Sequence, residues 1–143
     1  MADIQRLMVE GQAAPVSHYC HVVRAGNLVF VSGSVGIRPD GSIPEDPAQQ
    51  MEVALANVDA CLRAAGAGPE HVTKVTVFLT DIADRAKVNP PRQRYFAEHR
   101  PASTLVAVSA LVMPALKVEI EAIAVVDDPP GAEPRDVGQV VTF

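Results

Sequence analysis

The sequence predicts an α+β protein in which two helices pack on one face of a mixed β-sheet. Apolar residues alternate with a period of two in several short segments, and they recur at helical spacing in one long segment after residue 46. The segments follow the order β-β, α, β, α, β-β, with a further strand expected at residues 4–9. A chain of 143 residues is long enough for one domain with its own core. We expect that domain to cover residues 1–126 and residues 127–143, where the composition changes, to form a C-terminal extension.

The first two strands are expected as a β-hairpin over residues 18–33, "HYCHVVRAGNLVFVSG". Gly26 and Asn27 form a two-residue turn signal between two segments rich in β-formers. The next segment, "IRPDGSIPEDP", carries the Pro, Asp and Gly that are typical of a loop.

The first helix is expected to begin at Asp46, whose side chain can cap it, with Pro47 at the first helical position. Its apolar residues recur on one face as far as Ala65. Gly66 and Gly68 follow directly and are predicted to end the helix.

The second half of the chain is predicted to hold three strands and one helix. In the strand at residues 71–80, alternation places Val75, Val77 and Leu79 on one face and Phe78 on the other. Asn89 precedes two prolines and is expected to cap a helix that runs through residue 99. The segments at residues 103–111 and 116–126 are the remaining strands.

Composition excludes several classes of function. The net charge is −5 and no run of basic residues is present, which argues against nucleic acid or an anionic membrane as the main partner. Two cysteines, Cys20 and Cys61, fit a reducing compartment better than a disulfide framework. The N-terminus has no apolar signal segment and no stretch is long enough to span a bilayer, so we expect a cytoplasmic protein.

Two glutamates in the last strand are the first candidates for chemistry. Glu119 and Glu121 lie two residues apart and therefore point to the same face of an otherwise apolar strand. A carboxylate in such surroundings needs a partner, and a salt bridge is the simpler explanation for Glu119. For Glu121 a salt bridge and a role as general acid or base both stay open, because desolvation raises the pKa of a carboxyl group.

Other polar residues have structural explanations beside functional ones. Gly33 either ends a strand or lets the backbone approach a ligand closely. Asn89 is more simply a helix cap than a ligand contact, and Ser103 lacks the glycine elbow of an activated nucleophile. His18 and His21 would lie on opposite faces of a strand, which is poor geometry for a metal, so no metal site is expected.

Four stretches together resemble the Rid superfamily, the reactive intermediate or imine deaminases also known as the YjgF family. They are "RAGNLVFVSG", "NVDACLRAAGAGPEHVTKVTVFLTDI", "VNPPRQRYFAEHRPAS" and "KVEIEAIAVV", in the expected order over roughly residues 17–126. The resemblance implies a chorismate-mutase-like fold and a homotrimer whose three sheets form a barrel-like centre with a cleft at each subunit interface. It also implies hydrolysis of imines or enamines without a metal or organic cofactor.

The resemblance assigns roles to four residues. Tyr19, Gly33 and Asn89 match positions that line the cleft, and Glu121 matches the glutamate that positions or activates water. In typical deaminases the corner before the fifth strand reads Pro-Ala-Arg, and its arginine binds the substrate carboxylate through a bidentate fork. Here Ser103 stands in place of that arginine and would hydrogen-bond the ligand instead.

The serine leaves three interpretations open. The protein is a hydrolase for another imine, enamine or conjugated acid, or a non-catalytic trimer that binds a small metabolite, or a ribonuclease, which the acidic charge balance disfavours. Arg92, Arg94 and Arg100 lie near Ser103 in the sequence and are candidates for a replacement cation.

Overall fold

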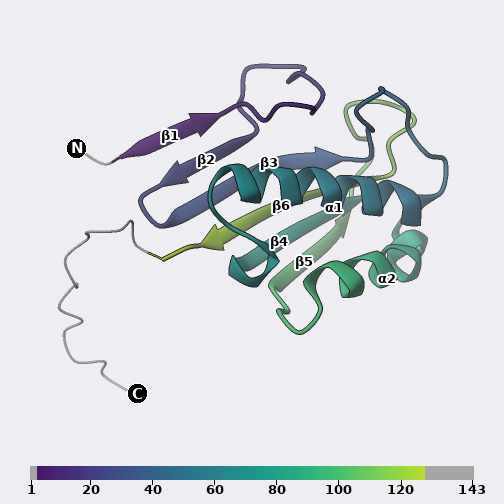
Figure 1. Ribbon diagram of the computed structural model, residues 1–143. Helices are drawn as coiled ribbons and strands as arrows, with labels where there is room; N and C mark the ends of the chain where they lie inside the picture. Colours follow the sequence, from purple (N-terminus) through teal and green to yellow (C-terminus); the bar gives the residue numbers. More distant parts are fainter. Residues whose placement is uncertain (1–2, 128–143) are drawn as a thin grey trace.

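The centre of the protein is one six-stranded sheet (Figure 1), described by a computed structural model over residues 3–127. The strands lie in the order β1-β2-β3-β6-β4-β5, and every neighbouring pair is antiparallel except β4 and β5, which are parallel. The predicted mixed sheet and its N-terminal strand are therefore confirmed. The strands are β1 (Ile4–Leu7), β2 (Val22–Ala25), β3 (Leu28–Val35), β4 (Val72–Leu79), β5 (Ala102–Ala107) and β6 (Val118–Val125).

Two helices, α1 (Pro47–Ala64) and α2 (Arg85–Phe96), cover one face of the sheet (Figure 1). Helix α1 packs on β3 and β6 and also against α2. Short 3-10 turns, η1 (Pro69–His71) and η2 (Ile82–Asp84), precede β4 and α2. The predicted layer arrangement is confirmed, and its core is built from fully buried side chains of α1, β4 and β6, among them Met51, Leu62, Val75, Val77, Leu79 and Ile120.

The hairpin forms around the predicted turn but is shorter than predicted. Ala25 pairs with Leu28 across the turn, and Gly26 has a φ of 60°, a conformation that glycine adopts without steric cost. The prediction that the first strand starts at residue 18 is wrong, because β2 begins at Val22. The side chain of His21 instead holds the preceding segment to the N-terminal loop through Val9 and Ala13.

Helix α1 begins and ends at the predicted places. The Asp46 side chain accepts a hydrogen bond from the backbone N–H of Ala48 at 3.2 Å, and Pro47 is the first helical residue. The chain leaves the helix through Ala65 and then Gly66, whose φ of 80° lies in the left-handed region.

Helix α2 starts five residues earlier than the sequence predicts, and it ends at Phe96 rather than at residue 99. The predicted cap, Asn89, lies inside the helix, with Pro90 and Pro91 following it in the interior. The helix is nucleated upstream, where Asp81 caps turn η2, and it is anchored by Val88, which is fully buried. Where proline occurs in a helix it is over-represented in the first turn, so its position here misleads a prediction from sequence alone.

The last two strands end where their partners end. Strand β5 stops at Ala107 rather than at the predicted residue 111, since its neighbour β4 stops at Leu79, with one further bond from Val108 N–H to the Leu79 carbonyl. The loop at residues 108–117 then returns the chain to β6. Residues 128–143, which make up almost all of the predicted C-terminal extension, lie outside the described part of the chain.

The face of the sheet opposite the helices carries exposed apolar side chains. Phe30, Val106 and Val125 are each 38–40% exposed although they come from three different strands. Within residues 3–127 no element covers this face, which is also the face that carries Glu119 and Glu121.

Candidate active site

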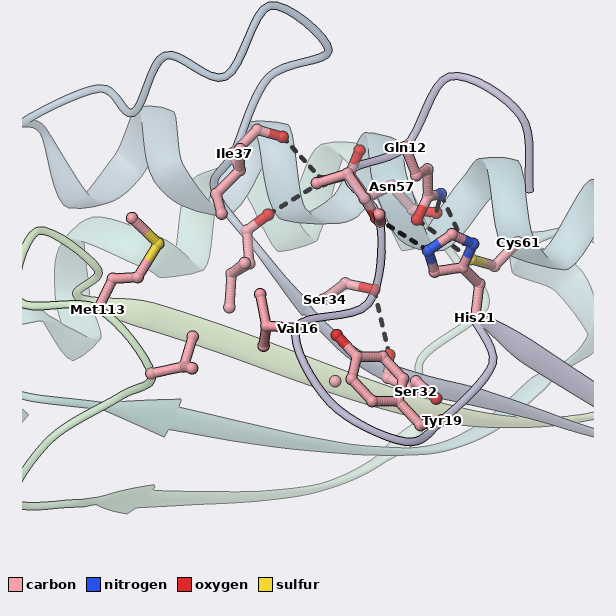
Figure 2. A pocket seen from close by; sticks show the side chains of 15 residues that line it. Gln12, Val16, Tyr19, His21, Ser32, Ser34, Ile37, Asn57, Cys61 and Met113 are labelled. Carbon is pink, nitrogen blue, oxygen red and sulfur yellow. Dashed lines mark hydrogen bonds between the residues drawn. The ribbon is translucent and has the colours of Figure 1, made fainter. Parts of the chain in front are cut away.

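A pocket opens where the N-terminal segment crosses the end of β3 (Figure 2). Its walls come from five parts of the chain: residues 12–21, β3, the loop that follows β3, α1 and the loop before β6. The residues that matter most for chemistry are Tyr19, Ser32, Gly33 and Ser34, with Met113 as an apolar wall. The structure therefore brings the predicted residues Tyr19 and Gly33 to one pocket.

Buried polar contacts hold the N-terminal wall of this pocket in place (Figure 2). His21 is buried, its Nδ1 accepts a hydrogen bond from the Val9 N–H at 2.8 Å, and its Nε2 lies 3.0 Å from the Ala13 carbonyl oxygen. An imidazole that accepts at Nδ1 and donates at Nε2 is neutral, and neither nitrogen is left to bind a metal. Gln12 completes the anchor by donating to the Asn57 carbonyl at 2.7 Å. Tyr19 is thus presented on a fixed loop.

Glu119 lies beside Gly33 on the open face of β6, outside the lining of this pocket. The β3–β6 ladder is irregular between Val31 and Ser34, and within this irregularity a side chain on Gly33 would overlap the Glu119 carboxylate. Glycine at position 33 therefore makes room for that carboxylate. A larger residue at position 33 would displace the end of the Glu119 side chain, a reason for glycine that the sequence alone did not reveal.

The two glutamates of β6 differ in their surroundings. Both point to the same face, as predicted, and this is the open face of the sheet; Glu119 is half-buried whereas Glu121 is exposed. Desolvation by burial, followed by the negative charge of Glu121, raises the pKa of the Glu119 carboxyl group above its usual range. Neither glutamate belongs to any ion pair formed among residues 3–127, so a salt bridge within the protomer does not explain either one.

Glu121 lies apart from the pocket, in a shallow depression of the open face. Lys74 and Thr76 from β4 and Phe30 from β3 surround it there. The Lys74 ammonium donates to the Thr104 hydroxyl at 2.7 Å rather than to the carboxylate.

The remaining predicted residues lie on the helix side of the sheet, near α2. Ser103 accepts a hydrogen bond from Nη2 of Arg92 at 2.8 Å. Asn89 lines a second cavity together with Arg92 and Arg100. Arg94 does not take part, because it forms an ion pair with Glu52 at 2.8 Å.

The structure thus divides the predicted site among three places in the chain. Tyr19 and Gly33 share the first pocket, Glu121 lies on the open face, and Asn89 and Ser103 lie beside α2. Sequence reasoning gave Glu119 a structural role and left Arg92 as one of three equal candidates. The residue that distinguishes Glu119 from Glu121 is Gly33, and the contact between Gly33 and Glu119 depends on strand register, which no local pattern reveals.

Within residues 3–127 no group of three or more His, Cys, Asp or Glu is placed to hold a metal ion.

The fold and the site first define a class: a small α+β protein with a tyrosine in a pocket at the end of β3 and a half-buried carboxyl group on the open face of its sheet. The chain belongs to the Rid (YjgF) family, since it matches the family described as Endoribonuclease L-PSP over residues 10–126. The predicted family is therefore confirmed.

In the described region no helix is both long and apolar enough to cross a membrane.

Named relatives and solved structures agree with this assignment. The 2-iminobutanoate/2-iminopropanoate deaminase of Escherichia coli K12 is 37% identical over 123 residues, which cover 83% of this chain and 95% of that protein. The crystal structure of the yeast protein YEO7 matches with a TM-score of 0.82 at 33% identity, over 86% of this chain and 98% of that one. The structure of Escherichia coli TdcF with bound serine matches with a TM-score of 0.78 at 36% identity, over 85% of this chain and 100% of that one.

Proposed function

We propose that the protein is a cytoplasmic, cofactor-independent hydrolase that deaminates a small imine or enamine with the help of a glutamate and water. The observation that carries the proposal is the Glu119 carboxyl group, which is half-buried, has a raised pKa and lies against Gly33, a residue that also lines the first pocket. A carboxyl group of this kind can exchange a proton with water near neutral pH. The names of relatives, deaminases of reactive intermediates among them, support the same reaction class.

The reaction needs only water and a group that carries protons. A water oxygen forms a bond to the carbon of the protonated imine while one of the water protons passes to the glutamate, and the electron pair of the C=N double bond moves to nitrogen. The glutamic acid then returns that proton to the nitrogen of the carbinolamine, the C–N bond breaks and ammonia leaves, and the hydroxyl oxygen forms the C=O bond and releases its proton. One imine and one water thus give one carbonyl compound and one ammonia. Tyr19, Asn89 and Ser103, with the backbone at Gly33, remain the residues predicted to hold the substrate.

Two glutamates compete for the role of carrying the proton. Sequence analysis assigns it to Glu121, whereas burial and the contact with Gly33 favour Glu119. Glu119→Gln and Glu121→Gln therefore form a pair of variants on one strand and one face. If Glu119 carries the proton, Glu119→Gln lowers kcat by about a hundredfold or more. Glu121→Gln then retains turnover and moves the acidic limb of the pH profile to lower pH, since it removes a charge that helps raise the pKa of Glu119.

The opposite result would return the role to Glu121. If both variants keep wild-type turnover of a genuine substrate, glutamate-assisted attack by water is wrong for this protein. The assay generates 2-iminopropanoate or 2-iminobutanoate in situ with an amino-acid oxidase and follows the competition between hydrolysis and trapping by semicarbazide. An inactive wild type together with an active Ser103→Arg variant would indicate that the water chemistry is intact and that the natural substrate is a different imine.

We further propose that the protein works as a homotrimer whose sheets face one another. The open face of the sheet exposes Phe30, Val106 and Val125, and a monomer rarely leaves apolar side chains from three strands uncovered together. Light scattering should give three times the 15.1 kDa of one chain. A monomer in dilute solution would refute this part of the proposal.

A binding protein without catalysis is the second candidate, favoured by the serine bound in the related TdcF structure. It predicts saturable binding of a small amino or keto acid with no ammonia released over hours. The family description Endoribonuclease L-PSP raises the third, a ribonuclease. RNA cleavage that survives extensive repurification would support it, against the expectation from a net charge of −5.

A further inference from the structure

Arg92 occupies an unusual position on the surface that α2 turns toward β5. Its guanidinium is half-buried, and Nη2 donates a hydrogen bond to the Ser103 hydroxyl at 2.8 Å. Its Nε is the one buried side-chain nitrogen or oxygen within residues 3–127 that lacks a hydrogen-bond partner. A buried donor left in this state is unfavourable, and in native proteins it calls for an explanation such as an acceptor that binds there.

The cavity beside Arg92 is positively charged. It is lined by Arg92 and Arg100, by the exposed amide side chain of Asn89 and by Phe96, and no acidic residue lines it. Two guanidinium groups and an amide donor against an aromatic wall are suited to a small planar anion.

The backbone at this cavity is also under strain. Ala97, which lines it, has a φ of 49° and is the only non-glycine residue with positive φ within residues 3–127. Strain of this kind persists where the surrounding structure enforces it, and it is found frequently at ligand sites. Here it turns the chain sharply out of α2 and brings Arg100 back to the cavity that Arg92 lines.

The other nearby arginine is already engaged. Arg94 points to α1, where it pairs with Glu52 at 2.8 Å. Arg92 has no carboxylate partner among the described ion pairs, and burial lowers the pKa of its guanidinium because the charged form loses hydration. An anion that pairs with Arg92 would offset that loss, whereas Arg94 would gain nothing from a second partner.

We propose that Arg92, positioned by Ser103 and assisted by Arg100, binds the carboxylate group of the substrate. The guanidinium supplies the charge and the planar fork that a serine hydroxyl at position 103 lacks. Ser103 positions this fork by accepting from Nη2, and its own hydroxyl proton stays free to donate to the same carboxylate. This inference deepens the proposed function by naming the cation that binds the substrate carboxylate, and it rests on that function for the reaction but not for the binding.

The test separates binding from turnover by using a stable ligand. The probe is 2-oxobutanoate, the keto acid that deamination of an imino acid would give, beside its uncharged amide, 2-oxobutanamide. Binding of each is measured by calorimetry or by ligand-observed NMR on the full chain. We expect the wild type to bind the acid about tenfold or more tightly than the amide, because only the acid pairs with a guanidinium.

Three variants identify the cation. Arg92→Gln should lose the preference for the acid and weaken its binding about tenfold or more, while its affinity for the amide changes little. Arg92→Lys keeps the charge without the fork and should restore part of the preference. Arg94→Gln is the matched control from the same helix and should leave both affinities unchanged. Circular dichroism and thermal unfolding establish that each variant is folded.

Each outcome bears on one proposal or the other. A wild type that binds acid and amide equally, or neither of them, overturns the inference, as does Arg92→Gln with unchanged preference for the acid. If acid binding depends on Arg92 but no imine is hydrolysed, the carboxylate site stands and the proposed catalysis fails. If imine hydrolysis proceeds equally well in Arg92→Gln, the catalysis stands and the carboxylate site fails.

Discussion

Gln50 is the buried polar residue that holds the loop before β6 against α1. Its side chain is fully buried, and its Nε2 donates to the carbonyls of Pro44 at 2.8 Å and Ala115 at 2.9 Å. Its Oε1 accepts from the backbone N–H of Lys117 at 2.8 Å. The loop held in this way also carries Met113, a wall of the first pocket. Replacing Gln50 by Met keeps the length of the side chain and removes all three bonds.

The cost follows from those three bonds. Each hydrogen bond contributes about 0.5–1.5 kcal/mol to stability, and a buried backbone group left without a partner costs at least as much. Relaxation of the loop would let water reach some of these groups, which reduces the total. We expect Gln50→Met to lower the free energy of unfolding by about 2–4 kcal/mol. With an m-value of about 1–3 kcal/mol/M, the urea midpoint should fall by about 1–2 M.

The assay is urea unfolding at one fixed protein concentration, with hydrogen exchange of the loop amides as a local readout. Gln49→Met is the matched control, because Gln49 is the preceding residue of the same helix and its side chain is exposed. It should change the midpoint little, while Gln50→Met also speeds exchange at residues 108–117. A loss below about 0.5 kcal/mol, or equal losses in the two variants, would refute the reasoning that the three bonds carry this stability.

Two further predictions concern charged side chains. The folded protein binds the Glu119 proton more tightly than the unfolded chain, so this group lowers stability as pH rises from the usual value of 4.5 through its raised pKa. Glu119→Gln removes that dependence, and the variant should gain stability relative to the wild type between pH 4 and pH 8 in urea titrations; an equal difference at both pH values would contradict the raised pKa. Asp46→Ala removes the side-chain oxygen that accepts from the Ala48 N–H, and it should lower the free energy of unfolding by about 1 kcal/mol in the same assay. Asp46→Asn keeps an acceptor oxygen and should retain most of that stability.

Signals that depend on neighbours in the sequence predicted most of the fold. The cap at Asp46, the turn at Gly26 and the alternation in β4 each place a residue through its own chemistry and that of the adjacent residues, and each is confirmed. The prediction for α2 is wrong because two signals conflict. Pro90 and Pro91 indicate a helix start, but burial of Val88 by tertiary packing extends the helix upstream of them.

The candidate site was less accessible to sequence reasoning because its contacts join distant strands. Nothing in the spacing of Gly33 and Glu119 shows that the irregular β3–β6 ladder brings them together. Likewise, Arg92, Arg94 and Arg100 are equivalent in the sequence. Their partners differ only because their side chains point in different directions in the folded chain. Arg94 forms an ion pair with Glu52, whereas Arg92 donates a hydrogen bond to Ser103.

The positions of Glu119 and Ser103 determine how a working site can be assembled. Glu119 points to the open face of β6, while Ser103 meets Arg92 on the helix side of β5, two strands away in the sheet. Two strand spacings amount to about 10 Å, and the sheet itself lies between the two side chains. A three- or four-carbon imino acid is too short to contact both within one protomer. If both proposals hold, each site must combine Glu119 of one copy with Arg92 of another.

Mixing two impaired variants tests this arrangement. Assayed well below saturation, Glu119→Gln and Arg92→Gln should each be strongly impaired alone, and trimers assembled by co-expressing them with different affinity tags should regain activity, since some interfaces join an intact Glu119 to an intact Arg92. Co-expression of each tagged variant with itself is the control. Mixed trimers as impaired as their parents would show that both residues must come from one protomer, and the separation of Glu119 from Arg92 would then rule out one of the two assigned roles.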